Sequence, residues 1–467
     1  MNKLIGKTFL YSIGTAASKL ISAIIIPIYA FFVTSEALGL YDFALTAAGI
    51  AAPICYLAIW EAVLRFTLTG GAEQKAGMQQ TVARFTLVVT AALAAAMILT
   101  GILFPEVTGI LLCCGFMSVS SALAQTWQYF ARSNQETRLF VLSGVISSLV
   151  NLGTLALLVC FAHMQFVGLG CSYVIAQVSI FVLVESRLRL LPEAIGRKCD
   201  RSILRKALAF SVPLIFNLVV SLLLAGFGRL LIVAVLGAEE NGNYVFAMKF
   251  GNVIAALGSA FSMAAIEEAI LRINSKGLGS YFSDLIDGLW KLLLPACIAA
   301  LPVIKGFYFF LSDSDYAASF PMVPLFLLYA VFGIMSTNYG NAFQVTLKTK
   351  YAAFTTLAGL IVAFILSIAL IGPMGEFGVS VGLTVGMGVV MAVRWGAAKR
   401  MIPFSTSRWP SLFLLVYLVE AAVLCLNVAS SPAFVAASAL LTAVPFGYLA
   451  SRGFKKLQSI RDAEEER

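Results

Sequence analysis

Long apolar stretches recur along the whole chain, separated by short polar segments. Each stretch holds about 20 residues or more, and at ~1.5 Å per residue this length crosses the ~30 Å hydrocarbon core of a bilayer. The pattern predicts an all-α integral membrane protein with about fourteen transmembrane helices. The predicted spans are 8–32, 38–63, 82–104, 107–131, 139–161, 166–185, 208–236, 243–266, 288–311, 319–344, 351–372, 377–398, 410–428 and 432–450.

Basic residues mark one side of the predicted membrane, because cytoplasmic loops collect Lys and Arg. If the N-terminus is cytoplasmic, nearly all of the 32 Lys and Arg fall in inner segments or in the two tails. The outer segments carry acids instead, such as Glu239, Glu240 and Asp313. This alternation predicts an even number of spans with both termini in the cytoplasm. The net charge of +9 is therefore a topology signal and does not indicate a nucleic-acid partner.

Composition agrees with a lipid-facing protein and excludes several other classes. Hydrophobic residues make up 60% of the 467 residues and charged residues 12%, against roughly 25% charged in soluble domains. The first apolar stretch is too long for a signal-peptide core and predicts an uncleaved helix. A single histidine and eight cysteines without CxxC spacing indicate no metal site and no disulfide framework. We expect no cofactor.

Two halves of the chain share short patterns in the same order. Gly39-Leu-Tyr-Asp-Phe43 begins the second predicted helix, and Gly242-Asn-Tyr-Val-Phe246 begins the eighth. The longest hydrophilic stretch lies between the halves and divides twelve spans into two sets of six. Because six is even, the repeat is parallel, a design in which transporters bind substrate between two lobes. The predicted parts are a six-helix lobe at 1–185, a cytoplasmic linker at 186–207, a second six-helix lobe at 208–400, and two extra helices with a cytoplasmic tail at 401–467.

These stretches resemble the polysaccharide-transporter branch of the multidrug/oligosaccharidyl-lipid/polysaccharide (MOP) exporter superfamily, the Wzx-type O-antigen flippases. The resemblance covers residues 1–400, and the last two helices match only by count. It is carried by Lys19 and Pro27 followed by Gly39-Leu-Tyr41, by Glu61-Ala-Val-Leu-Arg-Phe66, by Asp315-Tyr316 and by Gly375-Glu-Phe-Gly378. The resemblance implies a MATE-like architecture. It also implies export of an undecaprenyl-pyrophosphate-linked glycan to the outer leaflet of the bacterial inner membrane, with a polysaccharide polymerase as a candidate partner.

Cations inside the predicted spans are candidate substrate ligands, because a charge near the bilayer centre costs roughly 2.5–3.5 kcal/mol without a partner or a wet cavity. Lys19 lies near the middle of the first helix. It is expected to face a cavity and meet an anionic headgroup, or else to bridge neighbouring helices. Arg229, Lys249 and Lys305 each lie about 10 Å below the outer interface at 1.5 Å per residue, and Asn252 shares a face with Lys249. Three cations at one depth fit a pyrophosphate, whereas snorkelling to the interface is the alternative, favoured for Lys305.

A polar stripe follows one face of the fourth predicted helix and suits either sugar hydroxyls or hydrogen bonds between helices. Its members are Ser118, Ser121, Gln125, Gln128 and Arg132.

Acidic residues supply two further candidate roles. Glu61 and Arg65 are four residues apart, a spacing that allows a local ion pair or a gate contact between lobes. Asp42 and Glu420 are the acids that could couple transport to H⁺ or Na⁺.

Together these features predict a flippase that works by alternating access through a cationic cavity, and not an enzyme. A MATE-like drug/cation antiporter is the main alternative, although it would favour acids in the cavity. A lipid II flippase is a closer alternative. A membrane glycosyltransferase is disfavoured because such enzymes place catalytic acids and a large loop at the membrane surface, and no predicted outer loop is long.

Overall fold

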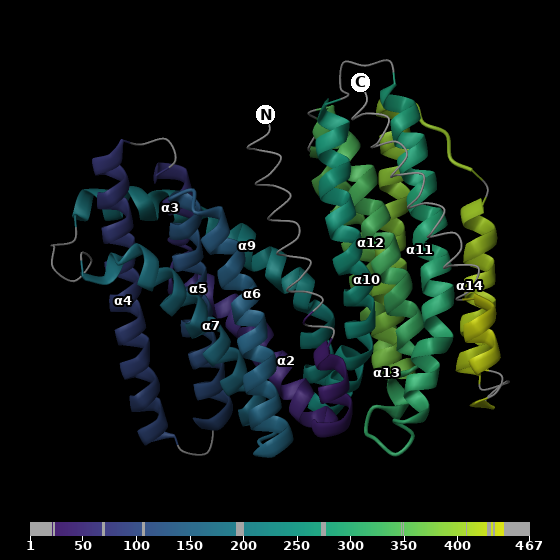
Figure 1. Cartoon of the computed structure of the whole chain (residues 1–467), viewed down its shortest axis with the longest axis horizontal. Coiled ribbons are helices and arrows are strands. Elements are labelled where there is room, and N and C mark those ends of the chain that lie inside the picture. Colours follow the sequence, from purple (N-terminus) through teal and green to yellow (C-terminus); the bar gives the residue numbers. More distant parts are fainter. Residues whose placement is uncertain are drawn as a thin grey trace. The chain divides into compact units, whose positions relative to one another are not determined.

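The computed structural model contains only helical elements in the residues that it describes, which confirms the predicted all-α fold class (Figure 1). These residues are 21, 24–67, 71–104, 108–192, 200–271, 277–346, 348, 350–407, 409–426, 431–432 and 435–442. The chain divides into two compact units, residues 1–245 and residues 246–467. The boundary between the two units falls inside one helix. The lobes at 1–185 and 208–400, which rest on the sequence repeat, stay a prediction.

The first unit is built from helices because a backbone in lipid must satisfy its own hydrogen bonds. Polar caps set some helix starts: Asp200 accepts from the N–H of Ser202 at 2.8 Å where α9 begins. The elements of this unit are α2 (Ser35–Cys55), α3 (Trp60–Thr67), α4 (Ala72–Leu103), α5 (Thr108–Ser133), α6 (Thr137–Leu155), η1 (Ala156–Phe161), α7 (Phe166–Leu188), α9 (Arg201–Val235) and the first residues of α10 (Ala238–Leu271).

In its described residues, the second unit contains the rest of α10 and several further helical elements. One of them, α13, covers two predicted spans, because a kink at Gly375 (φ 57°, ψ −143°) joins two helices end to end. Only glycine adopts such a backbone conformation readily. The elements are α11 (Leu278–Phe309), η2 (Ala317–Ser319), α12 (Met322–Val345), α13 (Lys350–Met401) and α14 (Trp409–Cys425).

Eight of the described helices are long and apolar enough to cross a membrane, and each overlaps a predicted span. The protein is therefore a multi-pass membrane protein. The eight helical stretches are Ser35–Cys55, Glu73–Leu103, Gly109–Ser133, Thr137–Phe161, Phe166–Leu188, Leu278–Phe309, Met322–Val345 and Lys350–Met401.

The second predicted span, 38–63, is interrupted. Its first helix, α2, ends at Cys55, and α3 starts at Trp60. Between them Leu57 (φ 52°) and Ala58 (φ 45°) have left-handed backbone conformations, which cost residues with a Cβ roughly 1–2 kcal/mol each. The apolar sequence hides this break, because hydropathy does not register backbone conformation.

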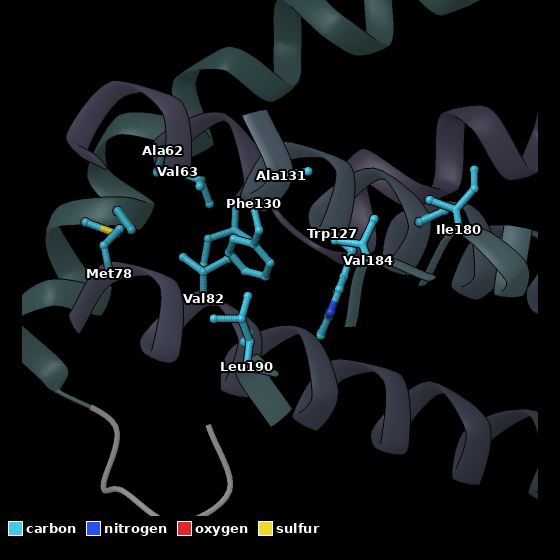
Figure 2. Packing of buried hydrophobic residues seen from close by; sticks show 14 residues of the cluster. Ala62, Val63, Met78, Val82, Trp127, Phe130, Ala131, Ile180, Val184 and Leu190 are labelled. Carbon is cyan, nitrogen blue, oxygen red and sulfur yellow. The ribbon is translucent and has the colours of Figure 1, made fainter. Parts of the chain in front are cut away.

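A buried apolar cluster joins α3, α4, α5, α7 and α9 in the first unit (Figure 2). Phe130 and Val82 pack within it, beside Trp127. The indole Nε1 of Trp127 donates to Glu185 Oε2 at 2.8 Å, and Glu185 Oε1 accepts from the N–H of Leu191 at 2.8 Å. The sequence analysis did not single out Glu185. Its carboxylate satisfies the indole N–H and fixes the end of α7 against α5.

In the second unit, Arg394 lies inside α13, within the predicted span 377–398. Its guanidinium donates to Thr355 Oγ1 at 3.1 Å, to Thr356 Oγ1 at 2.8 Å and to the carbonyl of Ser336 at 3.2 Å. A Cβ at Gly340 would lie 3.3 Å from Arg394 Nη1, so glycine there leaves room for the guanidinium. Arg394 thereby ties α12 to both arms of α13.

Candidate functional site

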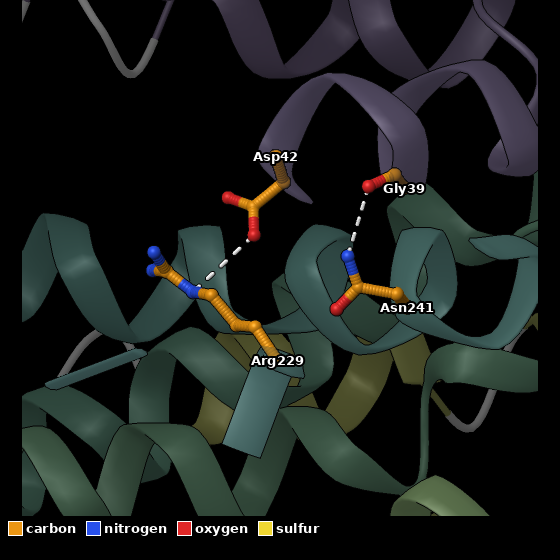
Figure 3. A network of polar contacts seen from close by, with 4 residues as sticks. All are labelled: Gly39, Asp42, Arg229 and Asn241. Carbon is orange, nitrogen blue, oxygen red and sulfur yellow. Dashed lines mark hydrogen bonds and ion pairs between the residues drawn. The ribbon is translucent and has the colours of Figure 1, made fainter. Parts of the chain in front are cut away.

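An ion pair joins α2 to α9 in the first unit (Figure 3). Arg229 Nε lies 3.4 Å from Asp42 Oδ2, with 25% of the Arg229 side chain exposed and 8% of the Asp42 side chain. The sequence analysis singled out both residues, but for separate roles: Arg229 as a substrate cation and Asp42 as an ion-coupling acid. The structure brings them together, so Asp42 balances part of the Arg229 charge.

Beside this pair, α2 and α10 cross with their backbones in close contact. Asn241 Nδ2 donates to the carbonyl of Gly39 at 3.0 Å (Figure 3). A Cβ at Gly39 would overlap the Ala238 carbonyl oxygen, and a Cβ at Gly242 would overlap the Ser35 carbonyl oxygen. Each helix thus offers a small residue four positions before its glycine, the arrangement that lets membrane helices approach closely.

The crossing is also symmetric in sequence, because Gly39 and Gly242 are the repeat-related glycines of the two halves. Each glycine packs against the other helix. Segments that the sequence assigns to different lobes therefore meet here, at the predicted outer ends of their helices. We call Ser35, Gly39, Asp42, Arg229, Ala238, Asn241 and Gly242 the outer clasp.

A second polar group lies at the predicted cytoplasmic end of the same unit. Tyr129 donates its hydroxyl to Glu61 Oε1 at 2.7 Å. The guanidinium of Arg132 lies over the rings of Tyr129 and Phe140, 5.3 and 5.7 Å from their centroids. The structure thus gives Glu61 a partner on α5, and its predicted pairing with Arg65 stays a prediction.

The polar stripe on α5 is partly used inside the unit. Ser118 donates to the Cys114 carbonyl at 2.8 Å, and Ser121 donates to the Ser118 carbonyl at 3.0 Å. Gln125 hydrogen-bonds the hydroxyl of Tyr129. Ser118 and Ser121 therefore serve helix structure, whereas Gln125, half-buried Gln128 and exposed Arg132 keep their predicted role as glycan ligands.

The remaining predicted residues fall elsewhere. Lys19 lies outside the described residues. In the second unit, Lys249 is half-buried on α10 and Asn252 is exposed on it, and Lys305 Nζ lies 4.3 Å from the centroid of the Phe320 ring. Glu420 lies on α14 with its Oε2 buried and bonded to no other described residue. In the described ranges, no three His, Cys, Asp or Glu side chains gather where they could hold a metal ion.

The ion pair supports a charge-swap prediction. Asp42→Asn and Arg229→Gln should each lower transport several-fold, because each leaves one charge without its partner. The double variant Asp42→Arg, Arg229→Asp should recover part of the loss, measured as transport per amount of folded protein. If Arg229 acts only by binding substrate, the swap will be as inactive as Arg229→Gln.

The sequence of residues 4–266 matches the polysaccharide biosynthesis protein family, over more than half of the chain. The chain belongs to this family. No curated protein sequence matches it.

Solved structures share the fold of this family member at low sequence identity. A structure of the lipid II flippase MurJ, in an inward closed conformation, aligns with a TM-score of 0.66 at 13% identity, covering 95% of this chain and 99% of that chain. An inward-facing MATE-family multidrug resistance transporter of the MOP superfamily aligns with a TM-score of 0.56 at 13% identity, covering 85% and 94%. The fold is shared with these MurJ and MATE-family structures, which confirms the predicted fold class.

Proposed function

We propose that this protein is a flippase that carries an undecaprenyl-pyrophosphate-linked oligosaccharide from the inner to the outer leaflet of the bacterial cytoplasmic membrane. The observation that carries the proposal is the outer clasp. It joins segments assigned to different lobes through small residues and one ion pair, contacts that can separate and re-form without exposing a large apolar surface. Such a contact suits the closed outer face of an alternating-access transporter, and the family assignment supports a polysaccharide precursor as cargo.

The free-energy cost of moving a glycan through hydrocarbon supports the same substrate class. Each glycan hydroxyl loses hydrogen bonds to water on entering hydrocarbon, so unassisted flipping is very slow. Polar groups such as Gln125, Gln128 and Arg132 replace those bonds, and cations such as Lys19 offset the pyrophosphate charge. The polyprenyl tail stays in lipid throughout. Transport of this kind requires binding of the headgroup and movement of the protein but no covalent step, so we propose no catalytic residue.

Deletion of the gene tests the proposal. Surface glycan should be lost and lipid-linked glycan should accumulate in the inner leaflet, while sensitivity to cationic drugs stays unchanged. Normal surface glycan together with heightened drug sensitivity would contradict the proposal and favour a MATE-like antiporter.

Lipid II is the second candidate substrate, favoured by the alignment that covers 99% of the MurJ chain. A strain depleted of its lipid II flippase distinguishes the two substrates. If lipid II is the cargo, this protein will restore growth in that strain. If the proposed oligosaccharide is the cargo, it will not, although it will restore surface glycan in its own deletion strain.

The proposed orientation places both termini in the cytoplasm. Single cysteines introduced at positions 239 and 313 of a cysteine-free variant should react with an impermeant thiol reagent in intact cells, because both positions lie in predicted outer segments. A cysteine at position 198 should react only after the cells are opened. Labelling at 198 with none at 239 would reverse the orientation.

A further inference from the structure

Three helices around the break between α2 and α3 each carry a buried polar side chain. Trp60 is 2% exposed, and Thr86 and Ser211 are 0% exposed. Yet Trp60 Nε1, Thr86 Oγ1 and Ser211 Oγ hydrogen-bond no other residue that the structure describes. Other Ser and Thr side chains in this unit bond back to a carbonyl one turn earlier, as Thr100 on α4 does to Ala96 and Thr126 on α5 does to Ala122, both at 2.8 Å. Three unsatisfied buried polar atoms near one backbone break require an explanation, because each costs roughly 1–3 kcal/mol.

The register of α3 and α4 places Trp60 and Thr86 at one level. Tyr56, at the start of the break, hydrogen-bonds Thr90 Oγ1 at 2.8 Å. Seven residues further along, Val63 lies with Val82 in the buried cluster (Figure 2). The two segments run antiparallel, so residue numbers rise along α3 while they fall along α4. Thr86 lies between Val82 and Thr90 on the α4 face that meets α3, opposite Trp60.

Ser211 occupies the corresponding place on α9. Ala207, one turn before it, packs in the cluster that contains Ile59. Ile215, one turn after it, packs against the cluster that contains Trp60. Residues four apart share a helix face. Ser211 therefore lies on the α9 face that covers the start of α3.

We infer that Trp60, Thr86 and Ser211 form a binding site for one buried water molecule at the start of α3. An indole N–H only donates, so the occupant must accept a hydrogen bond, which excludes a metal cation as the partner of Trp60. The two hydroxyls can donate or accept, and a water molecule satisfies all three groups with the approximately three bonds that buried waters make. The carboxylate of Glu61, the next residue after Trp60, disfavours an anion.

This site gives the interrupted helix a water-mediated contact with α4 and α9, which we call the polar joint. Leu57 and Ala58 hold left-handed conformations that the surroundings must maintain. A water bonded to α3, α4 and α9 holds these helices together through hydrogen bonds that exchange readily. Because α9 follows the predicted linker, the joint connects the end of the second predicted span to the first helix of the second half. The inference is independent of the transported substrate.

Hydroxyl-radical footprinting of the full-length protein in lipid nanodiscs tests the site. Radicals formed from a bound water react with the side chain beside it, even when bulk solvent does not reach that side chain. Trp60 should therefore oxidise several-fold faster than Trp127. Trp127 is the matched control, since it is 0% exposed and its Nε1 is already bonded to Glu185. Equal, slow oxidation of the two tryptophans would overturn the inference.

A variant supplies a second readout. Thr86→Val keeps the side-chain shape but removes a ligand, so it should slow the oxidation of Trp60 and lower the unfolding temperature by a few degrees. If the site is dry, Thr86→Val removes an unsatisfied polar group, and the unfolding temperature will rise or stay the same. If Thr86→Val fails to fold, the oxidation rates of Trp60 and Trp127 in the unsubstituted protein still decide between these outcomes.

Discussion

Gly39→Ala is expected to lower transport by roughly fivefold to 150-fold, the range that a coupling of about 1–3 kcal/mol gives. The added Cβ would overlap the carbonyl oxygen of Ala238, which belongs to the main chain and cannot move away by a side-chain rotation. Overpacking of this kind costs about 1–3 kcal/mol, occasionally more. If the outer clasp is one of the two end states of transport, this cost falls on that state and slows each cycle. Surface glycan and flipping by purified protein both measure the loss.

Gly49→Ala is the matched control on the same helix. A Cβ at Gly49 meets nothing within 4 Å, so this variant should transport normally and express at the same level. Gly242→Ala should behave like Gly39→Ala, because its Cβ would overlap the Ser35 carbonyl oxygen. Wild-type transport by a well-expressed Gly39→Ala variant would show that the crossing of α2 and α10 never needs to close so tightly.

Lys19→Gln is expected to weaken substrate interaction about ten- to hundredfold, because a hydrogen bond to a charged group contributes roughly 1.5–3 kcal/mol. Lys19 lies near the middle of the first predicted span, too far from either interface to snorkel easily. Glutamine removes the charge but keeps a donor. Lys19→Arg keeps the charge, so it should retain a substantial part of transport.

Expression separates the two roles of Lys19. A lysine that only bridges helices would lower the amount of folded protein and leave turnover per molecule unchanged. Lys305→Gln should be milder than Lys19→Gln, since Lys305 contacts the ring of Phe320 and is expected to snorkel. Full transport by a well-expressed Lys19→Gln variant would remove the main physical reason for an anionic substrate.

The sequence predicts the helical fold well because lipid imposes a simple rule on it. Every span needs about 20 apolar residues, and hydropathy reads this directly. Hydropathy does not predict backbone irregularities. The break at Leu57 and Ala58 has no glycine beside it, since none occurs between Gly49 and Gly70, and Pro53 is its nearest local signal. The kink at Gly375 is easier to anticipate, since Pro373 and a glycine stand together there.

The candidate site is less predictable because its contacts join distant parts of the chain. Asp42 and Arg229 stand out as charges in apolar spans, but their pairing depends on tertiary structure that hydropathy does not describe. Gly39 and Gly242 were recognised as repeat markers. The small residues four positions before them, Ser35 and Ala238, are the signal that could have predicted a close helix crossing. The sequence analysis did not single out Arg394, whose partners on α12 and α13 are set by tertiary structure.

The most direct test of the proposed flippase is a reconstituted flipping measurement. Purified protein is placed in liposomes that carry a short undecaprenyl-pyrophosphate-linked oligosaccharide, and an impermeant glycan-modifying enzyme is added outside. With active protein, the fraction of glycan open to modification should rise beyond the outer-leaflet share, and Gly39→Ala should slow this rise while Gly49→Ala should not. A fraction that stays at the outer-leaflet share with folded wild-type protein, in liposomes that nevertheless transport a cationic dye, would contradict the account.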